Sequence, residues 1–308
     1  MKIFAPNYYK KFSCIADKCN HSCCIGWEID IDENTMKQYS TIKTEFGEKL
    51  KENIVITNDC ACFKLTDNER CPFLNKNNLC EIILNLHEDS LCQICNDHPR
   101  FRNYFGDRIE IGLGLTCEEV ARIVVNENEP FELIEIDETD ENSTIYEDEI
   151  AFFNIRNEIF NIINSEQKFE TIVDKLLDKF NIEFPQKSVC KWVDIYEKLE
   201  MLDNNWGIML NKLKSSKSTQ ITLTYSNKNA LKNLLIYFIY RHLGESVYDE
   251  NFQGRLLFAI LSCYIISALY NMNYNIEDVA RMYSSEIEYS DENLTMIINL
   301  LQNENLEA

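Results

Sequence analysis

The residues of this sequence best suited to chemistry are its cysteines. The chain contains 13 of them, and they gather near the N-terminus. They form the groups Cys14-x4-Cys19-x3-Cys23-Cys24, Cys60-x-Cys62, Cys71-Pro72 with Cys80, and Cys92-x2-Cys95, while Cys117 stands alone. Closely spaced thiols on short loops can converge on one point, as ligation of zinc or an iron–sulfur cluster requires.

The cysteine pattern therefore predicts a metal centre, with structural disulfides as an alternative. Iron–sulfur is favoured over zinc because the thiols outnumber the four that one zinc ion needs and no standard zinc-finger spacing is present. Known ferredoxin spacings are not reproduced either. Cys190 and Cys263 lie in apolar helical contexts and are expected in the core. Cys60 and Cys62 are the weakest candidates in the cluster. The predicted ligands are in first place Cys19, Cys23, Cys71, Cys80, Cys92 and Cys95, and in second place Cys24, Cys14 and Cys117.

Basic residues near the last cysteine pair suggest an anion site. Arg100 follows His98 and Pro99. A guanidinium there can offset the charge of a thiolate cluster or bind a carboxylate or phosphate, so we assign Arg100 to cofactor binding. An exposed loop arginine is the alternative. His21 and His98 lie within cysteine groups and are weaker ligand candidates.

Composition limits the classes of protein that fit. The chain has 308 residues, of which 45% are hydrophobic, so it can bury a sizeable core. A net charge of −21 disfavours nucleic acid and anionic membranes as partners. Only 8 glycines occur, and neither a Walker A loop nor a complete Rossmann glycine loop is present.

Two features indicate a cytoplasmic protein, in which thiols stay reduced. The N-terminus shows no apolar signal-peptide core. The longest apolar run, 256–270, is shorter than the roughly 20 residues that span a bilayer, so it predicts a buried core helix.

The elements that must position these residues are expected to be mainly α-helical. We predict an irregular, metal-organised cysteine-rich module over 1–126, packed on a helical part over 150–308. Residues 127–149 contain 11 acids and no Lys or Arg, which is typical of a solvated connecting segment or of an acidic surface for a basic partner. Residues 33–50 are expected to be helical. Thr116-Cys117-Glu118-Glu119 has capping-box spacing and predicts a helix with Cys117 in its first turn.

Five segments of the sequence together form a recognisable pattern. They are Cys23-Cys24-Ile25-Gly26-Trp27, Cys71-Pro72-Phe73-Leu74 with Leu79-Cys80, Leu91-Cys92-Gln93-Ile94-Cys95 leading to Pro99-Arg100, Leu115-Thr116-Cys117-Glu118-Glu119-Val120-Ala121-Arg122, and Tyr283-Ser284-Ser285-Glu286-Ile287-Glu288-Tyr289-Ser290. These segments resemble the flagellin lysine N-methylase family, within a wider group of cysteine-cluster proteins described as zinc- or iron-chelating. Two departures stand out: His98 where Tyr is expected, and Glu118 where Pro often follows the cysteine. The chain is also short for the family.

The resemblance implies a protein that methylates lysine ε-amines of flagellin, with S-adenosylmethionine as donor. The cluster would then bind the donor or serve a structural role. The sequence does not single out a general base. A non-catalytic metal- or cluster-binding protein and an iron–sulfur redox protein are the alternatives.

Overall fold

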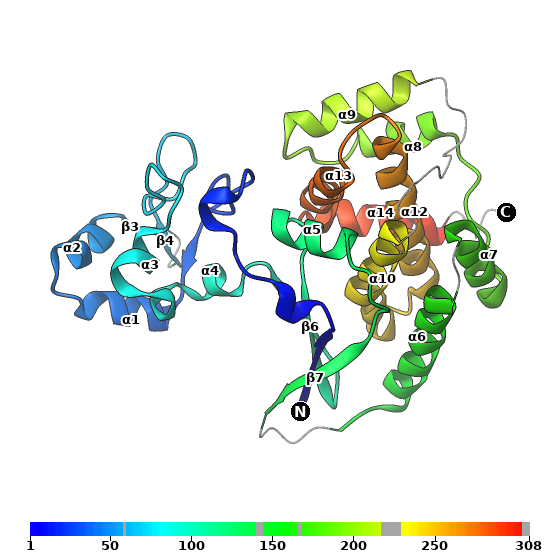
Figure 1. Ribbon diagram of the computed structural model, residues 1–308, viewed down its shortest axis with the longest axis horizontal. Helices are drawn as coiled ribbons and strands as arrows, with labels where there is room; N and C mark the ends of the chain where they lie inside the picture. Colours follow the sequence, from blue (N-terminus) through cyan, green and yellow to red (C-terminus); the bar gives the residue numbers. More distant parts are fainter. Residues whose placement is uncertain (58–59, 140–143, 166–167, 217–228, 304–308) are drawn as a thin grey trace. The chain divides into compact units, whose positions relative to one another are not determined.

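The structure is a computed structural model that describes residues 1–57, 60–139, 144–165, 168–216 and 229–303 (Figure 1). The chain forms two compact units. The cysteine-rich unit comprises Ser13–Arg100, and the helical unit comprises Met1–Phe12 and Phe101–Ala308. The cysteine-rich unit is therefore an insertion between two segments of the helical unit.

The cysteine-rich unit is built from short elements. An antiparallel sheet of order β2-β4-β3 joins β2 (Asp30–Ile31), β4 (Cys60–Phe63) and β3 (Ile54–Thr57). The helices are α1 (Glu33–Thr41), α2 (Glu45–Glu52), α3 (Glu81–Leu86) and α4 (Gln93–Asp97), with 3-10 turns η2 (Ala16–Lys18) and η3 (Glu88–Ser90). The side chains of Asp32 and Thr44 accept backbone N–H groups and begin α1 and α2.

A small aromatic core holds the cysteine-rich unit together. Phe63 and Phe73 are buried, and their ring centroids lie 4.9 Å apart in an edge-to-face arrangement. Tyr39 stacks on Phe63 and donates its hydroxyl to the Ser90 carbonyl. Because a unit of this size buries little apolar surface, extra cross-links such as metal ligation would add substantially to its stability.

The helical unit contains a four-stranded sheet of order β5-β6-β1-β7. The strands are β1 (Lys2–Pro6), β5 (Arg100–Tyr104), β6 (Arg108–Leu113) and β7 (Leu133–Glu138). Strand β1 runs parallel to β6 and antiparallel to β7. The N-terminal strand therefore belongs to the sheet of the helical unit, although the cysteine-rich unit separates it from its partners in sequence.

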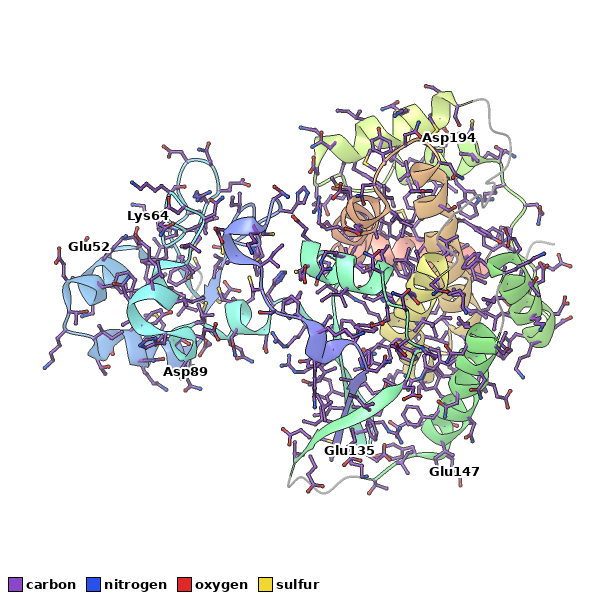
Figure 2. All side chains as sticks on the ribbon, in the orientation of Figure 1. Glu52, Lys64, Asp89, Glu135, Glu147 and Asp194 are labelled. Atoms are coloured by element: carbon purple, nitrogen blue, oxygen red, sulfur yellow. The ribbon has the colours of Figure 1, made fainter. Side chains whose placement is uncertain are left out.

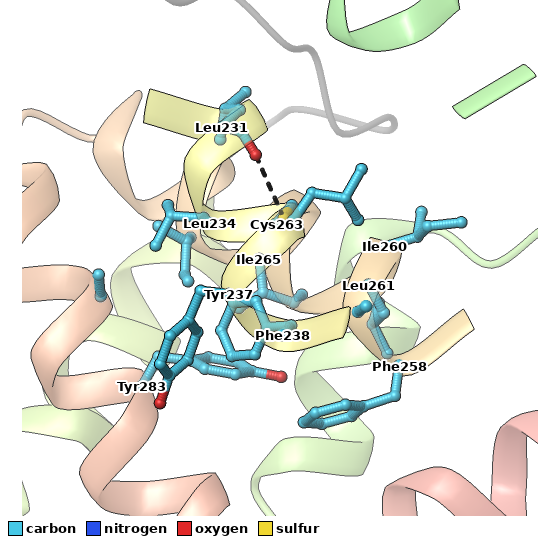
Figure 3. Packing of buried hydrophobic residues seen from close by; sticks show 14 of the residues in the cluster. Leu231, Leu234, Tyr237, Phe238, Phe258, Ile260, Leu261, Cys263, Ile265 and Tyr283 are labelled. Carbon is cyan, nitrogen blue, oxygen red and sulfur yellow. Dashed lines mark hydrogen bonds between the residues drawn. The ribbon is translucent and has the colours of Figure 1, made fainter. Parts of the chain in front are cut away.

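Helices make up most of the helical unit. Helices α10 (Ala230–His242) and α12 (Phe252–Tyr270) are largely buried, and Figure 3 shows their apolar side chains, Phe238 and Phe258 among them, in one cluster. Cys263 lies in this cluster, and its thiol donates to the Leu231 carbonyl at 3.8 Å. The remaining elements are η1 (Tyr9–Lys11), α5 (Glu118–Val125), α6 (Glu147–Ser165), α7 (Phe169–Phe180), α8 (Val189–Tyr196), α9 (Asn204–Ser215), η4 (Leu243–Glu245), α11 (Ser246–Asp249), α13 (Ile276–Tyr283), the π-helical η5 (Ser284–Glu288) and α14 (Asp291–Asn303).

A buried ion pair joins the sheet to the helices. Arg156 on α6 donates to both carboxylate oxygens of Glu110 on β6, each at 2.6 Å, and both side chains are almost fully buried. The guanidinium also lies over the rings of Phe152 and Phe153. Such a bidentate pair fixes the register between strand and helix, and removing one partner would leave a buried charge.

One helix in the described part of the chain, α12, is long and apolar enough to cross a membrane by length and composition. Within the structure, 78% of its most apolar window is buried. This burial confirms the prediction of a core helix over 256–270.

The mainly α-helical class is confirmed, and several local predictions need revision. The predicted helix over 33–50 is split into α1 and α2 around Ile42. Helix α5 begins where expected, but Cys117 is its N-cap residue and Thr116 bonds Ser285 instead of capping. The compact units also differ from the predicted ranges 1–126, 127–149 and 150–308, because β1, β6 and β7 share one sheet.

Candidate functional site

The fold of the cysteine-rich unit brings five of the predicted ligands close enough for their charges to affect one another's pKa. Sγ of Cys92 and Sγ of Cys95 are 3.3 Å apart. Burial raises the pKa of Cys71 to about 12, and the negative charges of Cys24, Cys80 and Cys92 add to this effect. Cys24 and Cys71 also raise the pKa of Cys95. These five residues come from three separate sequence groups, and we call them the thiol cluster.

Short-range backbone structure positions each member of the thiol cluster. The Cys71 N–H donates to the Cys24 carbonyl at 2.9 Å, which joins the first and third sequence groups. Cys80 pairs with Leu74 in an isolated bridge and is the N-cap residue of α3. Cys92 is the N-cap residue of α4. Loop residues and helix starts, rather than strands, thus present the thiols.

Asp32 ties α1 to the Cys92–Cys95 loop. Its carboxylate accepts the Thr35 N–H at 3.0 Å, the Thr35 hydroxyl at 2.7 Å and the Gln93 N–H at 2.9 Å. Burial of the carboxylate opposes ionisation, but these hydrogen bonds outweigh it and lower the pKa of Asp32 to about 2. One carboxylate therefore caps a helix and holds the loop that carries two of the thiols.

Two members of the cluster are held closer to the thiolate form than their neighbours. A hydrogen bond from Cys23 lowers the pKa of Cys24 to about 7. The contact between the Cys92 and Cys95 thiols lowers the pKa of Cys92 and raises that of Cys95. In each pair, the contact therefore favours the thiolate of one member. Thiolates are the donors that soft metals prefer, and metal binding would release the remaining thiol protons.

The thiol cluster matches a soft metal in donor chemistry but does not form a coordination shell. Among the residues that the structure describes, no group of three or more His, Cys, Asp or Glu side chains is arranged to hold a metal ion. Closure around an ion would require the thiols to shift.

The other predicted ligands occupy different positions. Cys14 is exposed, and Cys19 and Cys23 are partly exposed. Cys117 belongs to the helical unit, at the start of α5. Their participation in a metal site stays a prediction. Of the two weakest candidates, Cys60 is exposed and Cys62 is buried and donates to Glu28 at 3.0 Å.

Arg100 and His98 lie where the cysteine-rich unit ends. Arg100 is the first residue of β5 and donates to the Asn96 carbonyl at 3.1 Å. The His98 ring lies 6.2 Å from that of Trp27. Burial lowers the pKa of His98 to about 4, with a smaller effect from Arg100, so the ring is neutral at physiological pH. Binding of an anionic cofactor group by Arg100 stays a prediction.

A second cluster of polar side chains, in the helical unit, was not predicted. The Glu288 carboxylate is fully buried and accepts the Tyr237 hydroxyl at 3.1 Å. It also bonds the His242 ring at 2.5 Å and lies 3.4 Å from the Arg241 guanidinium. That guanidinium lies over the ring of Tyr289, which is 46% exposed.

The charge states of this second cluster follow from its burial. Burial lowers the pKa of His242 despite the adjacent carboxylate, so the neutral ring donates to Glu288. Burial opposes ionisation of Glu288, but the Arg241 charge and the hydrogen bonds from His242 and Ser284 together outweigh it and lower the pKa of that carboxyl. Residue 288 ends the π-helical segment η5, a geometry frequent at functional sites. The signal available in the sequence was the charged Tyr283–Ser290 motif between apolar helices.

Comparison with known proteins supports the family resemblance. The chain is 28% identical to "Lysine-N-methylase" of Salmonella typhimurium strain LT2 over 138 residues. The aligned region covers 42% of this chain and 34% of the relative. It is also 28% identical to "Flagellar biosynthetic protein FliU" of Salmonella muenchen over 130 residues. Here the aligned region covers 40% of this chain and 76% of the relative. A "Lysine-N-methylase" of Salmonella choleraesuis matches to the same extent as the first.

The matches cover only part of this chain and part of its relatives. The chain spans about a third of the length of the two lysine-N-methylases that it matches. No family model and no solved structure matches the chain. The resemblance to lysine-N-methylases is thus confirmed over about two-fifths of the chain.

Proposed function

We propose that this chain takes part in the N-methylation of lysine side chains on a flagellar protein, with flagellin as the substrate. The observation that carries the proposal is the similarity to Salmonella proteins named lysine-N-methylase, together with the flagellar name of the third relative. The thiol cluster gives further support, because three of the motifs that resemble the methylase family supply its five cysteines.

The proposed reaction transfers a methyl group from S-adenosylmethionine to a lysine ε-nitrogen. The carbon–sulfur bond breaks as the carbon–nitrogen bond forms, sulfur keeps the bonding pair, and the nitrogen loses a proton to a base. The phenols of Tyr237, Tyr240 and Tyr283 are poor candidates for that base because burial raises their pKa. Arg100 is the proposed contact to the donor's carboxylate, since a guanidinium matches that group.

We also propose that the thiol cluster binds a metal, an iron–sulfur cluster in preference to zinc. Five thiols in one small unit exceed the need of a single zinc ion, and soft thiolates favour both choices over hard cations. Ligation would join three loops and stabilise the small core of the cysteine-rich unit. A metal- or cluster-binding protein without methylase activity and an iron–sulfur redox protein are the competing functions.

The methylase proposal is tested by co-expression with flagellin and measurement of the intact mass of flagellin. We expect mass increments of one methylene group each, located on lysines by fragmentation and absent when the chain is omitted. A metal-containing protein that leaves flagellin unmodified would refute the proposal and favour a competing function.

The metal proposal is tested by anaerobic purification, visible absorption and metal analysis. A Cys92→Ser variant should lose colour and iron, while the matched Cys190→Ser variant, a half-buried thiol of the helical unit, should keep both. A colourless protein with stoichiometric zinc would refute the iron–sulfur choice. Full metal retention in Cys92→Ser would refute the assignment of this thiol.

A further inference from the structure

Strand β7 forms one edge of the sheet in the helical unit. It pairs with β1 on one side, and the strand order β5-β6-β1-β7 leaves no strand of the described chain on its other side. The side chains of Glu135, Asp137 and Glu138 are exposed, and Figure 2 shows Glu135 on the outside of the unit. An exposed edge presents backbone N–H and C=O groups on which a further strand can pair.

The charge along this edge has a single sign. Residues 127–149 contain 11 acids and no Lys or Arg. Two of the acids serve the fold, because Glu127 pairs with Lys11 and Glu149 accepts the Gly106 N–H. The acids of β7 face solvent, where Lys2 of the neighbouring strand pairs with Glu135 at 2.6 Å. The edge therefore attracts cationic segments and repels anionic ones.

We propose that β7 binds an extended, lysine-bearing segment of the protein substrate as an added fifth strand of this sheet. The unpaired edge selects an extended backbone, because main-chain hydrogen bonds supply much of the affinity in strand addition. The acidic side chains select lysine, through the charge complementarity described above. This inference rests on the proposed function and deepens it, since it names the surface and the chain conformation by which the substrate is recognised.

The proposal has a consequence for the reaction. A methylated lysine keeps its positive charge, so the β7 edge binds unmodified and methylated segments with similar affinity. The surface raises the rate of encounter with lysine-bearing chains and does not distinguish substrate from product. Acetylation, which removes the charge, abolishes the electrostatic part of the attraction.

Binding of a short fluorescent peptide to the full-length chain tests the proposal without methyl donor or turnover. The probe alternates lysine with threonine, and fluorescence anisotropy is recorded at several salt concentrations. We expect saturable binding that weakens with salt and persists when the lysines are trimethylated. A peptide of the same sequence with alternate backbone amides N-methylated should bind at least about tenfold more weakly, because it cannot pair with an edge. Equal binding of this peptide would refute strand addition.

Matched variants locate the surface. Glu135→Lys/Asp137→Lys should weaken binding by about tenfold or more, whereas Glu170→Lys/Asp178→Lys, which reverses two exposed acids on α7, should not. A neutral Glu135→Gln/Asp137→Asn variant should weaken peptide binding to an intermediate degree. A graded loss of affinity with charge would show that the charge reversal does not act through a folding defect. Equal loss in the α7 variant would overturn the assignment to β7. The peptide assay measures no methylation, so the two proposals can fail separately. If the chain binds the peptide but leaves flagellin unmodified in co-expression, the proposed function is rejected and the binding surface on β7 stands.

Discussion

Replacing Asp32 by alanine is expected to loosen the thiol cluster without touching a thiol. The Asp32 carboxylate caps α1 through the Thr35 N–H and also holds the Gln93 N–H, next to Cys92. Alanine removes both hydrogen bonds and leaves two backbone donors without this acceptor. The loop with Cys92 and Cys95 should then open more often, while the helical unit is unaffected.

The size of the effect can be worked out in two ways. Loss of a helix N-cap costs about 1 kcal/mol, and loss of the hydrogen bond to the loop amide costs about 1 kcal/mol more. Separately, the pKa of Asp32 is lowered from 3.8 to about 2, and each pKa unit corresponds to about 1.4 kcal/mol. The first route gives about 2 kcal/mol and the second about 2.5 kcal/mol, so the two agree. The pKa of the folded state is the lower one, so this stability is present above pH 3.8 and is lost as pH falls through about 2.

Hydrogen exchange followed by mass spectrometry separates the two units and serves as the assay. Peptides covering α1 and α4 in Asp32→Ala should exchange about thirtyfold faster, and peptides from α12 should be unchanged. Asp30→Ala, which removes an exposed carboxylate two residues away, is the matched control. Equal protection of α1 and α4 in the two variants would show that the Asp32 bonds do not hold the loop.

Three further predictions concern buried ionisable side chains. Arg156→Met should cost the helical unit about 3–5 kcal/mol by leaving the Glu110 carboxylate buried and unpaired, and Glu110→Gln/Arg156→Met should recover part of the loss in denaturant titrations. Glu288→Gln should destabilise the same unit by about 2–4 kcal/mol, because the Arg241 guanidinium loses its counter-charge. The loss is partial, since the glutamine oxygen can still accept a hydrogen bond from His242. An unchanged denaturation midpoint would contradict this prediction. Since burial lowers the pKa of His98 from 6.5 to about 4, the unfolded chain binds the proton first and the cysteine-rich unit loses stability as pH falls from 6.5 towards 4; a flatter profile in His98→Asn would confirm the source.

Hydrophobic periodicity made the helices of the C-terminal half predictable. The apolar stretch 256–270 lies within α12, and the acidic start of α5 lies where the capping spacing placed it. Local patterns suffice here because a helix satisfies its backbone hydrogen bonds within one segment. The sheet of the helical unit was not predicted. Strand β1 pairs with strands more than a hundred residues later in the chain, and no local sequence pattern indicates such a pairing.

The cysteine spacings identified the candidate site at the level of residue type. They predicted soft-metal chemistry and included Cys24, Cys71, Cys80, Cys92 and Cys95, which the fold brings together. They placed Cys19 and Cys23 ahead of Cys24, however, and so did not pick out these five from the nine candidates. Spacing constrains only residues on one loop, whereas convergence of three loops depends on contacts such as the Cys71 to Cys24 hydrogen bond.

Local patterns in the sequence are enough to predict a helical C-terminal half, a cysteine-rich N-terminal region, a net negative charge and a resemblance to lysine-N-methylases. Three features appear only in the folded chain: the cysteine-rich unit is an insertion, β7 is an edge strand, and Glu288 is buried against Arg241 and His242. The difference lies in the range of the interactions involved. Amphipathic periodicity and charge density are written into neighbouring residues, while strand pairing and burial of a charge depend on segments that meet only after the chain has folded.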